Sequence, residues 1–323
     1  MKHVLTRRAF AALAAAMLAA APAAAQQQMD RVHFLIPGGA GGGWDGAARG
    51  VGEALTKSGL VGNASFENMS GGGGGKAMVY MIDNARSNHG TLMVNSTPMI
   101  IRGLNGQVKQ TFRDMTPVAS VLGDYATLVV GKNSPIQSFE QFLSAYRANP
   151  NAVAVGGGSV PGGMDHLVAS MVLQAAGLDP LAVKYIPYDA GGMAMAGLLS
   201  GEIAVLSTGF SEAVDLANAG EVNIIGVTAR ERVPGFDVPT FAEMGYDMEF
   251  VNWRGFFGVP GLPAAERAAY EKLIADMLQT AAWEEVRARN GWITIHHSGD
   301  EFVKFLEAQE NEMKTLMVGL GFM

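Results

Sequence analysis

The stretch PGGAGGGWDG (Pro37–Gly46) sets the fold class of this 323-residue chain. It follows a strand-like run, RVHFLI (31–36), and precedes a helix-like run, GAARGVGEAL (46–55). Between a strand and a helix, glycines allow positive φ, let the backbone approach a ligand closely and turn several N–H groups toward the positive end of the helix. The stretch therefore predicts an α/β unit with an anion-binding turn.

A dinucleotide site is the alternative interpretation of the same stretch. Gly41–Gly46 spells GxGxxG in the required strand-turn-helix context. However, five of the six residues from 38 to 43 are glycine, so almost any glycine pattern matches there. An exported chain also meets little free nicotinamide cofactor. An exported nicotinamide- or flavin-dependent oxidoreductase remains the alternative function, and we expect no cofactor.

Two other glycine clusters approximate enzyme motifs without matching them. SGGGGGKAM (70–78) lacks the first glycine and the final hydroxyl of a phosphate loop. GGGSVPGGMDH (156–166) puts Ser159 in a frame like GxSxG that ends in Pro161, and the adjacent Asp165 and His166 cannot both reach Ser159 in a simple triad. Because neighbouring strand residues face opposite ways, His296 and His297 do not form a metal pair. We therefore expect neither an enzyme nor a metal site.

The first 25 residues predict an export signal. They combine a basic start, an Ala/Leu-rich run too short to span a membrane and an Ala-Ala-Ala end. The TRRAF sequence fits a twin-arginine signal as well as an ordinary secretory one, and both routes stay open. A periplasmic location follows if the cell has two membranes.

Composition limits the partners of the exported chain. The leader holds three of the 23 basic residues and no acidic one, which leaves 20 basic against 30 acidic residues. No basic stripe is present to neutralise nucleic-acid phosphates. The absence of cysteine excludes disulfides and thiolate metal sites. We expect a monomer that binds a small molecule.

Strand-like and helix-like runs alternate along the chain, which predicts an α/β fold with parallel strands. The segment 125–228 resembles a complete α/β unit, and FRDMTPVASVLGD (112–124) before it and ARERVPGFDVPTF (229–241) after it are interpreted as crossings. The predicted domains are 29–124 plus 229–323 and, inserted between them, 125–228, with two crossovers forming a hinge. The strand-like runs are 32–36, 64–68, 91–95, 127–131, 152–156, 183–188, 202–207, 223–228, 255–259 and 292–297.

The cluster at 156–166 follows a strand and precedes a helix, as the opening stretch does. Two such turns on two domains would hold a carboxylate from both sides of the hinge. A hydrogen bond to a charged group contributes about 1.5–3 kcal/mol, so four or five approach the roughly 8 kcal/mol of micromolar binding. Glycines that serve tight turns alone are the structural alternative.

These motifs together resemble the periplasmic receptors of tripartite tricarboxylate transporters, the TctC or Bug family. The resemblance rests on PGGAGGGWDGAARGVGEAL, ENMSGGGGGKA, VNSTPMI, FRDMTPVASVLGD, GGGSVPGGMDH, YIPYDAGGMAMAGLLSGEIAV and WRGFFGVPGLP. It implies a two-domain periplasmic binding protein of the type II, Venus-flytrap kind that hands a small carboxylate to membrane permease subunits. A sensor that passes the ligand's signal to a receptor is a further alternative.

The resemblance also implies the ligand-binding residues. Backbone N–H groups of the loops 38–45 and 158–163 would hold the carboxylate, with polar residues after two other strands at its far end and Tyr188 closing a wall. Asp45 is interpreted mainly as the N-cap of the following helix. The candidate residues are Gly39, Gly41, Gly42, Gly43, Trp44, Asp45, Asn95, Ser96, Thr97, Ser159, Pro161, Gly162, Gly163, Tyr188, Gly191, Gly192, Ser207 and Thr208.

The predicted ligand is a citrate-like di- or tricarboxylate. Many relatives carry an aspartate where this chain has Ser207 and Thr208, and its absence disfavours an amine-bearing ligand. The GGGWD form of the first loop resembles the tricarboxylate branch. Aromatic carboxylates stay open, because Trp44 and Trp253 could stack on a ring.

Overall fold

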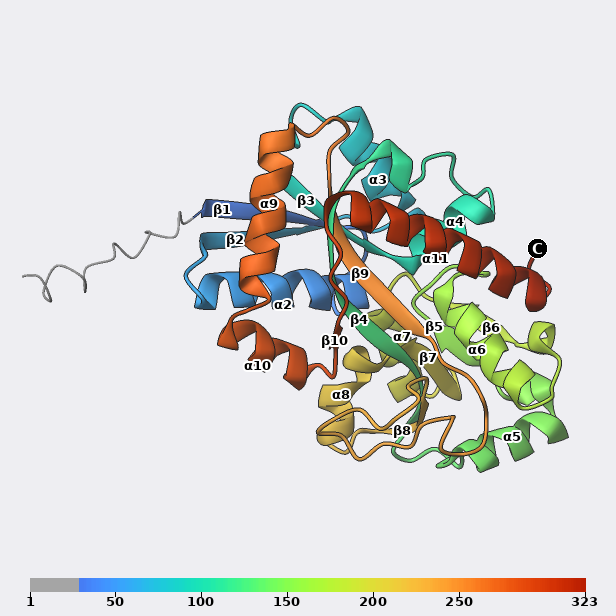
Figure 1. Ribbon diagram of the computed structural model, residues 1–323. Coiled ribbons are helices and arrows are strands. Elements are labelled where there is room, and N and C mark those ends of the chain that lie inside the picture. Colours follow the sequence, from blue (N-terminus) through green and yellow to red (C-terminus); the bar gives the residue numbers. More distant parts are fainter. Residues whose placement is uncertain (1–28) are drawn as a thin grey trace, which may run out of the picture.

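One long strand, β4 (Thr116–Gly131), joins the two halves of the sheet in the computed structural model, which describes residues 29–323. Its first half pairs with β9 (Val251–Gly258), and its second half pairs with β7 (Val205–Gly209) and β8 (Val222–Val227). The strand order is β2-β1-β3-β9-β4-β7-β5-β6. Figure 1 shows β4 and β9 running between the two lobes. The predicted export signal lies outside the described residues.

The first lobe holds both ends of the described chain. Its strands β1 and β2 and β1 and β3 pair in parallel, and β3 and β4 each pair with β9 in antiparallel fashion. Its elements are β1 (Met29–Ile36), α2 (Gly43–Lys57), β2 (Val61–Asn68), α3 (Gly75–Asp83), β3 (Thr91–Ser96), α4 (Thr97–Leu104), β9, α9 (Ala264–Met277), α10 (Ala281–Arg289), β10 (Ile293–Thr294) and α11 (Gly299–Gly319).

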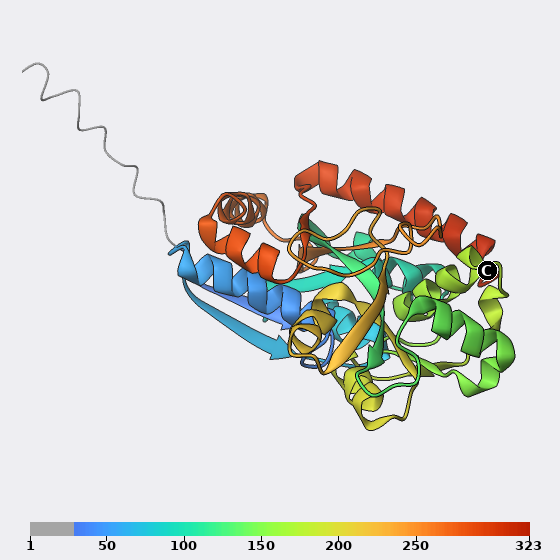
Figure 2. The ribbon, with the colours of Figure 1, turned by 90° about the horizontal axis from the view of Figure 1, so that it is seen from below.

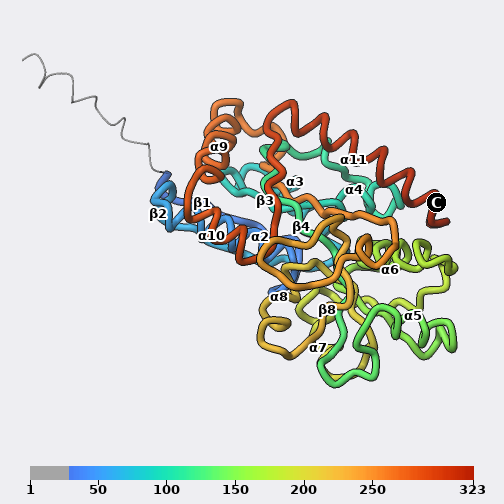
Figure 3. Tube along the Cα trace, turned by 60° about the horizontal axis from the view of Figure 1, so that its bottom comes forward, coloured from blue at the N-terminus to red at the C-terminus, as the bar shows by residue number. Residues whose placement is uncertain are grey.

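The second lobe repeats the strand-then-helix order on a smaller scale. Its core strands β5 and β6 and β5 and β7 pair in parallel. Figure 3 shows this lobe, in green and yellow, beside the first lobe in blue, orange and red. Its elements are α5 (Phe139–Ala148), β5 (Val155–Gly157), α6 (Met164–Ala175), β6 (Tyr185–Pro187), α7 (Gly191–Ser200), β7, α8 (Phe210–Asn218) and β8.

The two predicted crossings differ in structure. The stretch 112–124 includes the first half of β4, so this crossing is a continuous strand whose backbone is paired with β9 and which runs on into the second lobe. Residues 229–248 remain with the second lobe, since Val233, Phe241 and Met248 pack into its apolar clusters. We therefore propose that the second boundary lies at the start of β9. Each of the ten predicted strand runs overlaps one of β1–β10 in order.

Close packing of α2 against β2 and the α10 region requires two of its glycines. A Cβ on Gly50 would lie 2.9 Å from the Trp292 ring, and one on Gly52 would lie 2.5 Å from the Phe66 ring. The helix buries Ala47, Val51 and Leu55 on the same side, and the apolar spacing is that of one helix face. The start of α2 is therefore held rigidly at the edge of the space between the lobes.

Helix α11 connects the lobes along one side of the molecule, where Figure 2 shows it in red. Phe302 and Leu306 pack into the first-lobe core. At its other end, Gln174 Nε2 of α6 donates to Gly319 O at 3.0 Å, and the Phe322 ring meets His166 edge-on. Over residues 29–323, no helix is both long and apolar enough to cross a membrane.

Candidate functional site

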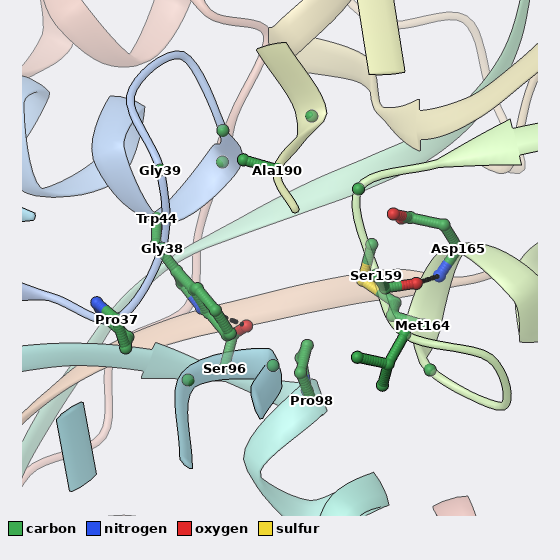
Figure 4. A pocket seen from close by; sticks show the side chains of 18 of the residues that line it. Pro37, Gly38, Gly39, Trp44, Ser96, Pro98, Ser159, Met164, Asp165 and Ala190 are labelled. Carbon is green, nitrogen blue, oxygen red and sulfur yellow. Dashed lines mark hydrogen bonds between the residues drawn. The ribbon is translucent and has the colours of Figure 1, made fainter. Parts of the chain in front are cut away.

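A pocket of about 760 Å³, counted with its open mouth, lies between the lobes. Four glycine-containing loops line it: 37–43 and 70–74 from the first lobe, and 158–163 and 189–191 from the second. In Figure 4, Trp44 and Pro37 form one wall, Ser159, Met164 and Asp165 form the facing wall, and Ser96 and Pro98 close one side. The pocket is therefore enclosed by both lobes, as a ligand held by hinge closure requires.

Five helices begin at this pocket. Their N-cap residues all line it: Gly42 of α2, Gly74 of α3, Ser96 of α4, Gly163 of α6 and Ala190 of α7. Three of these N-caps are glycine and one is alanine, and the fifth, Ser96, does not cap its helix with its side chain, so the first N–H groups have no side-chain acceptor. A helix N-terminus carries roughly half a positive charge and free N–H donors. Five of them around one space create a site for an anion.

Glycine is required where the loops touch one another. A Cβ on Gly158 would lie 2.2 Å from Gly191 N, and one on Gly192 would lie 2.9 Å from Ala40 O in the opposite lobe. Real Cβ atoms do not approach backbone atoms so closely, so larger residues would force the loops apart. Ser70 Oγ also donates to Asp189 Oδ2 at 2.7 Å, which joins the lobes at the rim.

Arg102 supplies an unpaired cation to the pocket. It comes from α4 and is 1% exposed. Its Nε donates to Pro98 O at 3.2 Å and its Nη1 to Gly72 O at 3.3 Å, while its Nη2 has no partner. Burial lowers the pKa of Arg102 to about 10. A buried guanidinium without a carboxylate partner is costly unless an anion binds beside it.

Arg254, a second buried arginine that lines the pocket, is already paired. It lies on β9 and is 2% exposed. Its Nη2 donates to Asp124 Oδ2 at 2.8 Å, and its Nη1 donates to Gly43 O at the start of α2. Asp124 also accepts hydrogen bonds from Ser211 N and Ser211 Oγ. This ion pair therefore joins β4, β9, α2 and α8 beneath the pocket.

Two further carboxyl groups line the pocket near Arg254. Burial raises the pKa of Asp165 to about 7, against the lowering effects of Ser159, Gly158 and Arg254. Burial also raises the pKa of Glu212 to about 8, assisted by repulsion from Asp165 and Asp124. Both groups lie in first helical turns, where the dipole opposes this shift by about 0.3–1 kcal/mol and by up to about 2 kcal/mol in a partly buried site, or about 1.5 pKa units. Burial is the largest cause for both groups and raises both pKa values well above the usual carboxyl range.

Eight of the eighteen predicted residues line the pocket. They come from both glycine turns, from the end of β3 and from the start of α7. Trp44 Nε1 donates to Ser96 Oγ at 2.8 Å, which fixes the indole against this wall. The eight are Gly39, Gly42, Gly43, Trp44, Ser96, Ser159, Gly163 and Gly191.

Four predicted polar residues are buried behind the pocket and do not line it. Asn95 Oδ1 accepts from Ser96 N, and Thr97 N donates to Asn252 Oδ1. Ser207 Oγ donates to Asp165 O at 2.8 Å, and Thr208 is 1% exposed. The hydrogen bonds of Asn95, Thr97 and Ser207 hold the backbone of neighbouring residues, including the pocket residues Ser96 and Asp165.

The remaining six predicted residues lie at the edges of the loops. Gly41 and Gly192 contact each other across the lobes, and Gly162 donates its N–H to His166 Nδ1. Tyr188 packs against Gly197 on the side of the second lobe, and Pro161 lines a neighbouring cavity. The sixth, Asp45, is discussed next.

Asp45 is not the N-cap that the sequence suggested. Helix α2 begins at Gly43, so Gly42 is the N-cap and Asp45 lies in the first turn. Its Oδ2 accepts from Gly41 N at 3.1 Å, and its Oδ1 accepts from Arg49 Nε and Asn68 Nδ2. Asp45 therefore fixes the shape of the first glycine loop from the side away from the pocket.

Two ligand-related expectations are also corrected. Trp253 is 1% exposed and packs against Phe257, Phe302 and Phe305 in the core, so it cannot stack on a ring in the pocket. The sequence found no carboxylate after the strand at 202–207. However, Glu212, five residues beyond that run, lines the pocket.

Neither hydrolase nor metal chemistry gains support in the described part of the chain. Ser159 Oγ bonds to the Tyr185 hydroxyl at 3.0 Å and accepts from Asp165 N, while His166 Nδ1 accepts from Gly162 N. The histidine is therefore turned toward the loop backbone and not toward Ser159. Residues 29–323 contain no cluster of three or more metal-ligating side chains.

Sequence reasoning missed Arg102, Arg254, Glu212 and the loop 70–74 as parts of one site. The loop had been considered only as a failed phosphate motif. One available signal was Arg102 itself, a single charged residue in the apolar run TPMIIRGL (97–104). A lone arginine on a buried helix face needs a partner, and within residues 29–323 Arg102 forms no ion pair with a carboxylate.

The fold and the pocket define a two-lobed ligand-binding protein of the periplasmic-binding-protein class. The model of the tripartite tricarboxylate transporter family receptor matches residues 47–322, and the chain belongs to this family. The predicted fold and family are thereby confirmed.

Known relatives are similar at low identity. A UPF0065 protein from the TAR-I ttuE-ttuC' intergenic region of Agrobacterium vitis is 25% identical over 253 residues, covering 77% of this chain and 70% of that protein. The periplasmic binding protein BugD superposes with a TM-score of 0.80 at 19% identity, covering 90% of this chain and 98% of BugD. MatC of Rhodopseudomonas palustris with bound malate superposes with a TM-score of 0.77 at 20% identity, covering 88% and 98%. These structures share the fold.

Proposed function

We propose that this protein is an exported solute receptor that captures a small carboxylate between its lobes and delivers it to a membrane permease. The observation that carries the proposal is the convergence of five helix N-termini on one pocket that also holds the unpaired guanidinium of Arg102. Each N-terminus stabilises an anion by about 0.3–1 kcal/mol, and more in a partly buried site. Arg102 adds a charged donor of the kind that carboxylates favour.

Family membership supports the transport role, because the family's receptors serve tripartite tricarboxylate transporters. The malate bound to MatC supports a small carboxylate as the ligand class. A citrate-like di- or tricarboxylate, periplasmic location, a monomeric state and delivery to permease subunits remain predictions. The sequence-based leader is consistent with export.

Tryptophan fluorescence offers a direct test, because Trp44 is the tryptophan at the pocket while Trp253, Trp283 and Trp292 are each 1% exposed in the core. Citrate, isocitrate, tricarballylate, malate and benzoate would be titrated into the purified mature protein, with calorimetry in parallel. We expect saturable binding of at least one carboxylate with a fluorescence change that Trp44→Phe removes.

Two results would contradict the proposal. The first is the absence of binding by both methods across the whole carboxylate panel. The second is an absorbance spectrum of the fresh protein that shows copurified nicotinamide or flavin, as the oxidoreductase alternative predicts. Pull-down of permease subunits rather than a signalling receptor would separate transport from sensing.

A further inference from the structure

The carboxyl groups at the Arg254 end of the pocket outnumber the cations there. Asp165 and Glu212 line the pocket together with one guanidinium, that of Arg254, whose Nη2 already donates to Asp124. Glu212 Oε1 accepts from Gly209 N, and Asp165 is 6% exposed. Desolvation with too few cations favours the neutral acid, and for Asp165 it outweighs the hydrogen bonds from Ser159 and Gly158 that favour the ionised form. The Arg254 end of the pocket therefore presents carboxyl groups that favour the protonated form.

The Arg102 end is chemically opposite. Arg102 is 1% exposed, its Nη2 has no hydrogen-bond partner, and no carboxylate of the described residues pairs with it. An anion bound at this end would compensate its charge. Cβ atoms on Gly73 and Gly75 would touch Arg102, whereas one on Gly191 would touch Glu212. The two ends thus lie under different loops of the same pocket. A ligand that fills the pocket meets Arg102 with one group and the acids with another.

We propose that Asp165 and Glu212 bind the second oxygen-bearing group of a dicarboxylate as neutral, proton-donating carboxylic acids, so that ligand capture takes up protons from solvent. This inference rests on the proposed function and specifies the second half of its ligand. A neutral acid donates an O–H hydrogen bond to a ligand oxygen, while an ionised acid would repel a second carboxylate. The same pair would disfavour monocarboxylates, which leave the acids without an acceptor.

The groups that face the pair come from every neighbouring element. Arg254 of β9 and Asp124 of β4 compensate each other. Tyr185 of β6 bonds to Ser159 beside Asp165, and burial raises the pKa of this phenol far above its usual range, so it stays neutral. The exposed Asp189 is engaged by Ser70 at the rim. The helix N-termini stabilise an arriving carboxylate, and none of these groups supplies a free cation to the pair.

Calorimetry between pH 7 and pH 9 tests the proposal with malate, adipate and tricarballylate, which keep their full charge across this range. Because burial places the pKa of Asp165 at about 7 and that of Glu212 at about 8, rising pH removes the protons that the complex needs. Because each acid that must regain a proton contributes up to tenfold per pH unit, we expect Kd to increase by about 50-fold between pH 8 and pH 9. Titrations at pH 8 in two buffers of different ionisation enthalpy should show net proton uptake.

Matched variants test whether the pH dependence of binding comes from Glu212. Glu212→Gln keeps an N–H donor and an oxygen for Gly209, so it should retain binding and reduce the rise in Kd between pH 8 and pH 9 to the roughly tenfold that Asp165 alone causes. Glu140→Gln alters an exposed first-turn acid of α5 and should leave the profile unchanged. Aspartate and malate differ by an ammonium in place of a hydroxyl, and malate should bind more tightly.

Several outcomes overturn the inference. They are proton release on binding, a Kd that is constant or falls with rising pH, and tighter binding of aspartate than of malate, which would mean an ionised pair that holds a cation. The wild-type proton count decides the matter even if Glu212→Gln fails to fold. Failure to bind any carboxylate at any pH would instead overturn the proposed function itself.

Discussion

The two buried arginines of the pocket have nearly the same exposed fraction but different hydrogen-bond partners. Arg254 is 2% exposed and is held by Asp124 in an ion pair that connects four elements. Arg102 is 1% exposed and is held by two carbonyl oxygens alone. Burial therefore does not distinguish a structural arginine from a ligand-binding one. The presence of a carboxylate partner inside the chain does.

The same difference separates stability from binding. Removing a paired arginine leaves its partner as an uncompensated buried charge, whereas an unpaired arginine already carries that cost in the empty protein and is compensated when an anion binds. Arg254 should matter most for folding and Arg102 most for affinity. Two substitutions test this separation, and a third tests the bond that links the two ends of the pocket at its rim.

The largest effect is expected for Arg254→Met. It leaves Asp124 buried without its cation, and removing one partner of a buried ion pair typically costs about 3–5 kcal/mol. Urea unfolding followed by circular dichroism measures the loss. The double variant Arg254→Met with Asp124→Asn should recover much of it, because no buried charge remains. Equal stability of wild type and the single variant would end the structural assignment of Arg254.

Arg102→Met should act in the opposite sense. It removes an uncompensated buried charge, so the free energy of unfolding should stay level or rise. Carboxylate affinity should fall by about 10- to 150-fold, since a charged hydrogen bond contributes about 1.5–3 kcal/mol. Calorimetry measures the affinity, and Arg147→Met, in the last turn of α5, is the matched control. Unchanged affinity in Arg102→Met would place the anion elsewhere.

The smallest effect is expected for Ser70→Ala. Ser70 precedes the loop over Arg102, and Asp189 precedes the loop over Glu212, so their bond links the two ends at the rim. Because it is exposed, its loss should weaken carboxylate binding by about 1 kcal/mol or less. The exposed Ser87→Ala, measured in the same titration, should match wild type. A loss beyond tenfold would show that the rim bond controls closure.

Local patterns in the sequence predicted the strands and both glycine turns correctly. The run before Pro37 and the run after Gly43 carry their periodicity over neighbouring residues, so no distant contact was needed to interpret them. Errors arose where distant contacts decide. Residues 116–124 become a strand because β9 pairs with them, and Asp45 is drawn to Arg49 and Asn68 instead of capping its helix.

The sequence by itself determined the alternation of strands and helices, the family and the two glycine turns at 37–43 and 158–163, because these depend on residues adjacent in the chain. The tertiary structure alone decided that α3, α4 and α7 also begin at the pocket, that Arg254 is neutralised by Asp124 and that Arg102 is not. Charge pairing is set by distances between residues far apart in sequence. For that reason the proposed carboxylate site includes a guanidinium that local sequence patterns did not identify.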